Sequence, residues 1–411
     1  MNRKTIQAVT GCLVVQICVG IVYLWSALKG SVVATYGEAQ GWTMGAANQV
    51  ASIMLFSFVF GGLIGGFLND KKGSRLTCFA GVGLFSAGIA LAAFAHSVTA
   101  FTFTYAIMAG LGSGFAYVAC IACVQKWLPH RRGLAAGLAT TAFGLSTVVF
   151  APIVSWLVNI YRDANGIVDF VPVFLILAAV FATLGFLGCT QVSLPSAEYI
   201  ASLNLPKKTV ISNVNYTLSE AIRTKAFWAL FFSIFLINGT WNLCVPLIKD
   251  LGIVRGLTET VAIACVSFTG ITNAAGRLFM SMLSDRIGRT KTMYILSLLT
   301  VLGAILLTFI TGSGYFTAIA LVAFAYGGPA PIFAALCTDL FGPKNAGTNY
   351  GVCLLALGLS AIIFNLLSTY VLHSTVQNMT ATFIMGAVTA AIPILLMIYI
   401  NNYLKNRAQA N

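Results

Sequence analysis

Long apolar segments dominate the chain, and short polar segments separate them at nearly regular intervals. A run of about 20 apolar residues crosses a bilayer as one α-helix. We count twelve such runs, with centres near residues 18, 56, 85, 113, 145, 180, 238, 270, 301, 326, 359 and 390. The alternating strands of an outer-membrane barrel are absent. The pattern predicts an all-α integral membrane protein with twelve transmembrane helices.

The polar segments and their flanks reveal an internal duplication. Asp70 and Gly73 follow the second predicted helix, and Asp285 and Gly288 follow the eighth, 215 positions later. A second set recurs at an offset of 214: Pro129, Gly133, Gly137, Gly144, Leu145 and Ser146 match Pro343, Gly347, Gly351, Gly358, Leu359 and Ser360. Matches at nearly one offset predict two six-helix repeats, and such repeats enclose a substrate site near the membrane midplane.

The repeat divides the chain into three parts. We expect an N-terminal six-helix bundle at residues 1–190, a cytoplasmic linker at 191–225 and a C-terminal six-helix bundle at 226–411. In the linker, the run from Thr217 to Glu220 predicts a capping box that opens a short helix.

Composition and charge narrow the class of protein. Of the 411 residues, 59% are hydrophobic and 8% are charged, with a net charge of +13. With a cytoplasmic N-terminus, 18 of the 23 lysines and arginines lie in cytoplasmic segments and four in external loops. The positive-inside rule then predicts a multi-pass protein of the cell (inner or plasma) membrane with both termini cytoplasmic. The basic charge sets topology and attracts anionic membrane lipid, which argues against nucleic acid as a partner.

The remaining cation, Arg277, lies deep in the eighth apolar run. It precedes Asp285, at the cytoplasmic edge, by eight residues, or about 12 Å of helix, while half the hydrocarbon layer is about 15 Å thick. A cation there costs about 2.5–3.5 kcal/mol, and no acid shares an apolar run with it. We interpret it as the binding site of a transported anion. The alternative is a structural cation bonded to the carbonyls of a broken helix.

Several motifs resemble a known family. The loop from Gly66 to Arg75, echoed after the eighth helix, resembles the signature of the major facilitator superfamily. Four further stretches look like the oxalate/formate antiporter family within it: Gly20 to Ser26, Lys126 to Gly133, Tyr216 to Arg223, and Asn349-Tyr350-Gly351. The animal monocarboxylate transporters are related to that family. The resemblance implies a two-bundle transporter of small anions.

Polar residues in other apolar runs complete the predicted site. Asn273 lies one turn before Arg277, where the animal relatives carry an Asp; it offers an amide to substrate or to another helix. Tyr117 and Tyr326 are neutral donors for a carboxylate, or packing residues, and Tyr23 is a weaker candidate. The sequence after Tyr326, with two glycines and two prolines, predicts a broken or kinked helix.

One position at which this chain differs from the resembled oxalate carriers predicts the size and charge of the substrate. Oxalate carriers of the resembled family have a Lys six residues after the Asn-Tyr-Gly motif, and this chain has Leu357 there. A dicarboxylate would face one cation, whereas a monocarboxylate forms a neutral pair with it. The resemblance also implies a coupling role for Lys29 near the outer end of the first helix. Its alternative is a lysine that snorkels to the membrane surface.

The duplicated loops predict a gate. In the resembled superfamily, aspartates at the positions of Asp70 and Asp285 bond to arginines and to a helix N-terminus, and so close the cytoplasmic side. The helix dipole favours such a contact. We expect Arg75, Arg132 and Arg289 as partners.

The sequence therefore predicts a secondary transporter of small monocarboxylates, such as lactate or pyruvate, in symport with a proton by alternating access. Obligatory carboxylate exchange is the alternative. A membrane sensor and a membrane enzyme are less favoured, since His96, His130 and His373 lie in or beside loops and no catalytic cluster is visible. We expect no cofactor, no metal site and a monomer.

Overall fold

The computed structural model describes residues 3–20, 25–37, 40–203, 215–244, 247–372, 375 and 377–410. Their regular structure is helical apart from two isolated β-bridges, Arg162 with Val168 and Thr375 with Asn378. The chain packs as two compact units. Unit 1 comprises Met1–Trp127, Ala142–Asn204 and Ala346–Val352, and unit 2 comprises Leu128–Thr141, Leu205–Asn345 and Cys353–Asn411.

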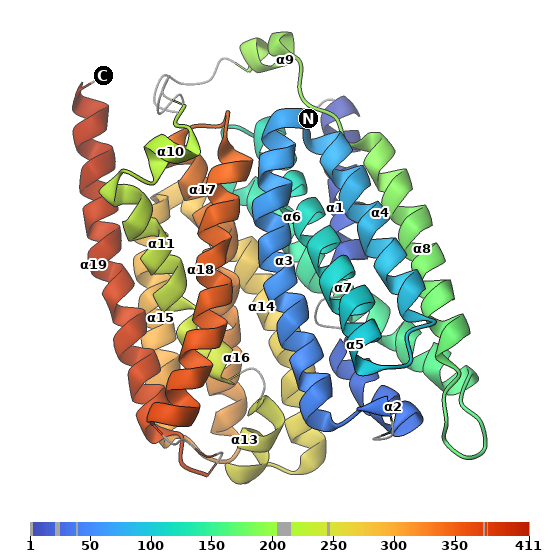
Figure 1. The fold of residues 1–411 in the computed structure, drawn as a ribbon. Coiled ribbons are helices and arrows are strands. Elements are labelled where there is room, and N and C mark those ends of the chain that lie inside the picture. The colour runs from blue at the N-terminus through green and yellow to red at the C-terminus, as the bar shows by residue number, and fades with distance from the viewer. Residues whose placement is uncertain are drawn as a thin grey trace. The chain divides into compact units, whose positions relative to one another are not determined.

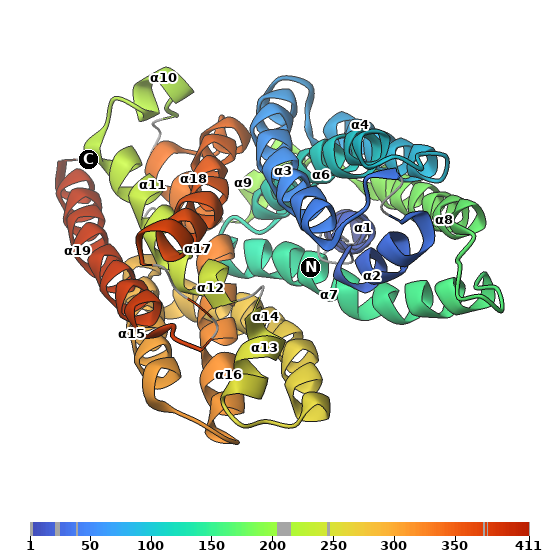
Figure 2. The same ribbon diagram turned by 60° about the horizontal axis from the view of Figure 1, so that its bottom comes forward.

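Unit 1 is built around α6. This helix packs against α1, α3 and α4, while α8 packs against α1 and α4 (Figure 1). A short helix, α2, packs against α3 (Figure 2). The elements are α1 (Arg3–Val19), α2 (Trp25–Tyr36), α3 (Met44–Lys72), α4 (Ser74–Ala92), α5 (Val98–Phe101), the π-helix η3 (Thr102–Met108), α6 (Ala109–Trp127), α8 (Phe170–Gln191) and α9 (Ala197–Ser202).

Glycines set the distance between α3 and α6. A Cβ added at Gly61 or Gly65 of α3 would overlap the backbone of Leu111 or Phe115 on α6. A Cβ at Gly114 of α6 would in turn overlap the backbone of α3. Without a hydrophobic force between helices in lipid, such backbone contact supplies the packing energy.

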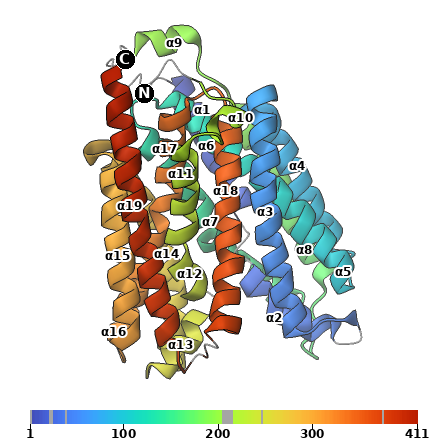
Figure 3. The same cartoon turned by 60° about the vertical axis from the view of Figure 1, so that its left-hand side comes forward.

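Unit 2 holds the second set of helices. Here α14 packs against α16, and α19 packs along α11 and α15 (Figure 3). The elements are α10 (Leu218–Ala221), α11 (Lys225–Ile237), α12 (Gly239–Cys244), α13 (Ile248–Val254), α14 (Glu259–Ile287), α15 (Arg289–Phe309), α16 (Gly314–Gly327), α17 (Pro329–Phe341), the π-helix η5 (Leu367–Val371) and α19 (Thr380–Ala410). The predicted capping box at α10 is confirmed, since Thr217 and Glu220 bond to each other's backbone amides.

Two helices are shared between the units. The start of α7 (Arg132–Ile160), up to Thr141, belongs to unit 2, and its remainder belongs to unit 1. Likewise the start of α18 (Ala346–Leu366), up to Val352, belongs to unit 1. The units therefore exchange the first turns of these two helices. The division of the chain at residues 190 and 226 stays a prediction.

Eleven helical segments of the described residues are long and apolar enough to cross a membrane. They coincide with the second to twelfth predicted helices. The first predicted helix, centred near residue 18, falls on α1 and α2, and residues 21–24 between these helices lie outside the described part. Large apolar side chains such as Phe309 and Leu395 are exposed on the helices, as a lipid-facing surface requires.

The two duplicated loops have the same backbone conformation. Gly73 joins α3 to α4 with φ 85° and ψ 161°, and Gly288 joins α14 to α15 with φ 102° and ψ 149°. Only glycine adopts this region without strain. The repeat seen in the sequence is therefore a repeat of geometry, and it places Asp70 and Asp285 in the last turns of α3 and α14.

Candidate functional site

Arg277 is buried in α14, with 5% of its surface exposed. Its Nε donates to Asn273 Oδ1 at 2.8 Å, one turn earlier on the same helix, and its Nη1 donates to the carbonyl oxygen of Thr140 on α7 at 3.1 Å. Its Nη2 makes no hydrogen bond with a described residue. No carboxylate of the described residues lies within the 4.0 Å of an ion pair. The guanidinium therefore has no charged partner among the described residues and keeps part of its bonding capacity.

Close packing of α16 on α14 shapes the surroundings of this arginine. A Cβ added at Gly276 would overlap the carbonyl oxygen of Phe324, and one at Gly327 would overlap the carbonyl oxygen of Asn273. These two glycines let the backbones touch at the level of Arg277. The same contact places Tyr326, next to Gly327, on the helix beside the predicted anion-binding pair.

Tyr326 lies at the end of α16, and its ring stacks on Trp241 of α12 with centroids 5.1 Å apart and planes 21° from parallel. The helical segment is interrupted here, as predicted: α16 ends at Gly327, and α17 begins at Pro329. Gly328 keeps helical dihedral angles, so the interruption comes from prolines that lack an N–H. Sequence reasoning missed Trp241, because nothing separates it from the other aromatics of its apolar run.

The remaining predicted substrate residues belong to unit 1. Tyr117 on α6 is buried, its ring packs edge-on against Phe58 and Phe143, and its carbonyl accepts a hydrogen bond from Gln16. Lys29 on α2 is half-buried, and its Nζ donates to Asn48 Oδ1 at 3.1 Å. Tyr23 lies outside the described residues.

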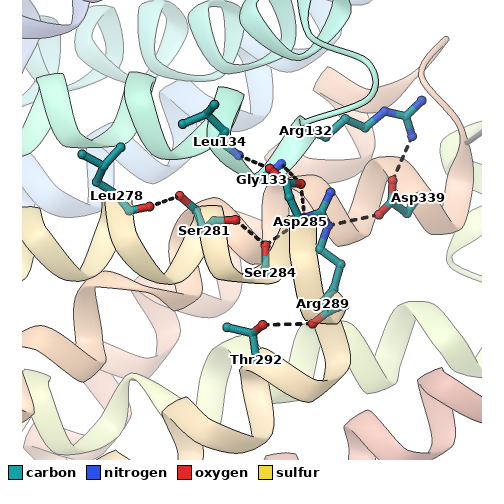
Figure 4. Close-up of polar contacts among 11 residues, drawn as sticks. Arg132, Gly133, Leu134, Leu278, Ser281, Ser284, Asp285, Arg289, Thr292 and Asp339 are labelled. Carbon is teal, nitrogen blue, oxygen red and sulfur yellow. Dashed lines mark hydrogen bonds and ion pairs between the residues drawn. The ribbon is translucent and has the colours of Figure 1, made fainter. Parts of the chain in front are cut away.

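Asp285 connects α14 to the start of α7. Its carboxylate accepts hydrogen bonds from the amides of Gly133 at 2.9 Å and Leu134 at 2.7 Å, and it pairs with Arg289 (Figure 4). These amides are the unpaired donors of a helix N-terminus, where the dipole favours a negative charge. The carboxylate therefore caps α7 and neutralises an arginine at once.

A second acid completes this network. Asp339, near the end of α17, accepts from Arg132 Nη1 at 2.9 Å and pairs with Arg289 Nε at 3.3 Å (Figure 4). Sequence reasoning missed Asp339 because the duplication does not mark it: at the offset of 214, its counterpart is Gln125. The one available signal was an acid at the end of an apolar run, four residues before Pro343.

Asp70 makes the corresponding contact inside unit 1. It accepts from the amides of Gly347 at 3.2 Å and Thr348 at 2.6 Å, at the start of α18, and from Asn69 Nδ2 at 3.1 Å. No ion pair within 4.0 Å joins it to a described basic residue, and Arg75 is exposed. The two loops thus share the amide contacts, and only the contact at Asp285 is reinforced by arginines.

Comparisons with known proteins identify the family and the fold. Residues 17–365 match the sequence profile of the Major Facilitator Superfamily. The chain belongs to this superfamily. The fold is similar to the crystal structure of FucP, a transporter of this superfamily, in the outward conformation. The match covers 97% of this chain and 99% of FucP, with a TM-score of 0.73 and 15% sequence identity. The all-helical fold predicted from the sequence is confirmed, and the protein is a multi-pass membrane transporter of the secondary class and not an enzyme.

Three curated relatives in the superfamily are distant. The uncharacterized MFS-type transporter YhjX of Escherichia coli is 27% identical over 86% of this chain and 84% of its own length. The oxalate:formate antiporter of Oxalobacter formigenes is 27% identical over 70% of this chain and 66% of its own length. Monocarboxylate transporter 13 of Bos taurus is 25% identical over 82% and 76%. The predicted resemblance to oxalate/formate and monocarboxylate transporters is confirmed.

Proposed function

We propose that this transporter carries a small monocarboxylate, of the size of lactate or pyruvate, together with a proton. One observation supports this above all: Arg277 is a buried cation whose only hydrogen-bond partners among the described residues, Asn273 and Thr140, are uncharged. A carboxylate would neutralise this charge and occupy the free Nη2. The curated relatives named for oxalate, formate and monocarboxylates handle the same chemical group.

The charge balance favours a monoanion. A monocarboxylate and one guanidinium form a neutral pair, whereas oxalate would bring a second negative charge into a low-dielectric site. The position that supplies a second cation in the resembled oxalate carriers is Leu357, which is half-buried on α18. Asn273 and Tyr326 then serve the hydroxyl or keto group that distinguishes lactate and pyruvate from acetate.

Coupling to a proton makes the transport cycle electroneutral. The empty site holds a buried positive charge, which disfavours an occluded state, and the bound anion removes that penalty. The protein then alternates between its two access states with the substrate bound. The proton travels on the substrate carboxyl or on an aspartate nearer the membrane surface.

Uptake into proteoliposomes tests the proposal. Radiolabelled lactate is offered outside vesicles whose lumen is more alkaline and contains no carboxylate. For one coupled proton, we expect accumulation of about tenfold per pH unit, and a protonophore should abolish it. Protein-free liposomes measure the leak of undissociated acid. Uptake that requires preloading of the lumen with a carboxylate rejects symport and supports obligatory exchange, the alternative that the antiporter relative favours.

A further inference from the structure

Arg277 takes part in a second structure besides the proposed anion site, the contact between the start of α7 and α14. We call this contact the α7–α14 seam and define it by Gly133, Leu134, Gly137, Thr140 and Thr141 on α7 and by Ala274, Arg277, Ser281, Ser284 and Asp285 on α14. All ten residues belong to unit 2 or to the segment of α7 packed in it. On each helix they recur at three- and four-residue spacing, so each set lies along one face.

The seam is continuous from the cytoplasmic end of α14 to the depth of Arg277. At its outer end, Asp285 holds the amides of Gly133 and Leu134. In its middle, Gly137 lies so close to α14 that an added Cβ would overlap the Ser281 hydroxyl. Figure 4 shows Ser281 and Ser284 following one another along α14 toward Asp285.

Arg277 forms the deep end of the seam. Its Nη1 donates to the Thr140 carbonyl at 3.1 Å, and the Thr141 hydroxyl donates to the Ala274 carbonyl at 3.4 Å beside it. Of these two bonds between α7 and α14, the one from Arg277 to Thr140 has a charged donor. The same guanidinium that would bind a substrate therefore also ties α7 to α14.

A guanidinium grips a carboxylate with two parallel N–H groups, either Nε with Nη2 or Nη1 with Nη2. Asn273 occupies Nε, and Thr140 occupies one proton of Nη1. A grip through Nε and Nη2 competes with the bond to Asn273. A grip through Nη1 and Nη2 brings the carboxylate to the nitrogen that already donates to Thr140. In either geometry the carboxylate competes with an internal partner for the guanidinium.

Thr140 is the partner that yields at lower cost. Its carbonyl lies inside α7, where the regular helical ladder supplies its other hydrogen bond, so release of Arg277 leaves no buried group unsatisfied. Release of Asn273 would instead strand an amide oxygen on a side chain that is 9% exposed. A carboxylate also outcompetes a neutral carbonyl for a cation, because the hydrogen bond is charge-assisted.

We propose that the Thr140 carbonyl is the internal ligand of Arg277 in the empty transporter, and that the substrate carboxylate replaces it and loosens the α7–α14 seam. This inference rests on the proposed function, since it needs a carboxylate at Arg277. Binding at the deep end thereby weakens the same helix contact that Asp285 closes at the cytoplasmic end. Substrate binding at Arg277 then favours opening of the cytoplasmic side.

Hydrogen–deuterium exchange of the purified full-length transporter tests this, with mass spectrometry of peptides that cover residues 128–141. The amides of Gly133 and Leu134 report directly, because Asp285 protects them. We expect lactate to speed exchange in this segment by about threefold or more. Arg277→Gln should show fast exchange without lactate and no further response. Peptides of α8, which is not part of the seam, report any general unfolding.

Two variants keep the test decisive. Arg255→Gln removes a similar bond, from Arg255 Nη1 to the Thr308 carbonyl at 3.3 Å, and should leave the segment and its lactate response unchanged. Gly137→Ala places a methyl group against Ser281 and the Arg277 carbonyl oxygen, and it should speed exchange while the Arg277 guanidinium stays intact. It therefore shows whether the seam responds if Arg277→Gln fails to fold.

The outcomes separate the two proposals when lactate binding is measured on the same samples. Binding of lactate to the wild type without faster exchange, or slow exchange in folded Arg277→Gln, overturns the inference and leaves the proposed function standing. Absence of lactate, pyruvate and formate binding overturns the proposed function, and the ligand exchange at Arg277 falls with it.

Discussion

In our proposal, the binding chemistry of this transporter is concentrated in one guanidinium. Arg277 touches Asn273 on its own helix and Thr140 on another, and neither partner carries charge. A hydrogen bond between a charged donor and a neutral acceptor contributes about 1.5–3 kcal/mol. The two bonds therefore offset the cost of burying Arg277 without neutralising its charge. The side chain is thus held in place and remains electrostatically incomplete, as a binding group for an anion requires.

Replacement of this arginine by lysine tests whether the planar fork matters. We expect Arg277→Lys to lower the kcat/KM for lactate uptake by about tenfold or more, because an ammonium loses at least one charge-assisted bond. Initial uptake rates in proteoliposomes measure the effect, with the amount of inserted protein fixed. Arg255→Lys serves as the matched control and should transport normally; an active Arg277→Lys protein would remove the two-pronged grip from the mechanism.

Leu357 sets the charge of the substrate in our proposal. A second cation there would allow a dianion to be neutralised, so Leu357→Lys is expected to strengthen competition by oxalate against lactate uptake by about tenfold. Inhibition constants for oxalate, formate and acetate in the variant and the wild type give the comparison. Leu355→Lys, on the same helix, is the control for a general effect of added charge. Equal oxalate inhibition in all three proteins contradicts the monoanion argument.

At the level of elements, the two duplicated loops are alike in geometry and unlike in charge. Asp70 and Asp285 each cap the first turn of a helix through two amides. Only Asp285 is joined to a network of Arg289, Asp339 and Arg132, whose side chains are 11–14% exposed. Solvent and salt screen these largely buried ion pairs less than they screen surface pairs. We therefore infer that the cap on α7 is stronger than the cap on α18.

Matched substitutions of the two aspartates measure this difference. Asp285→Asn leaves Arg289 with a weakened partner set and is expected to cost about 2–3 kcal/mol, against about 1 kcal/mol for Asp70→Asn. Apparent melting temperatures in detergent should fall in that order. Amide exchange should increase at the start of α7 in the first variant and at the start of α18 in the second. Equal effects at both sites would mean that the arginines add nothing to the cap.

At the level of the whole molecule, the sequence predicts most of the architecture. Apolar runs located the helices, because a bilayer demands about 20 apolar residues for each crossing. The recurrence of Asp70 and Gly73 as Asp285 and Gly288 predicted the duplication, because only glycine fits the joining turn. Helical spacing placed Asn273 and Arg277 on one face of their helix. The hydrogen bond between their side chains was not predicted.

The parts that escaped prediction are contacts made through the backbone or between distant segments. The bond to Thr140 uses a backbone carbonyl, which every residue possesses, so the sequence cannot indicate which residue accepts it. Trp241 and Tyr326 lie far apart in the chain, and only the packing of α12 and α16 brings their rings together. Asp339 has no acidic counterpart in the first repeat, so the repeat pattern does not mark it as functional.

The capping contacts of α7 and α18 are made to four main-chain amides, and the contact of Arg277 with α7 is made to a main-chain carbonyl. Main-chain groups survive almost any substitution of the residue that carries them. A genetic screen for transporters that are permanently open or permanently closed should therefore find its mutations on α3 and α14, which supply the side chains of these contacts. Along the first turns of α7 and α18, inherited variation should be silent except at Arg132, which pairs with Asp339, and at the glycines, where a single methyl group is enough to be selected against.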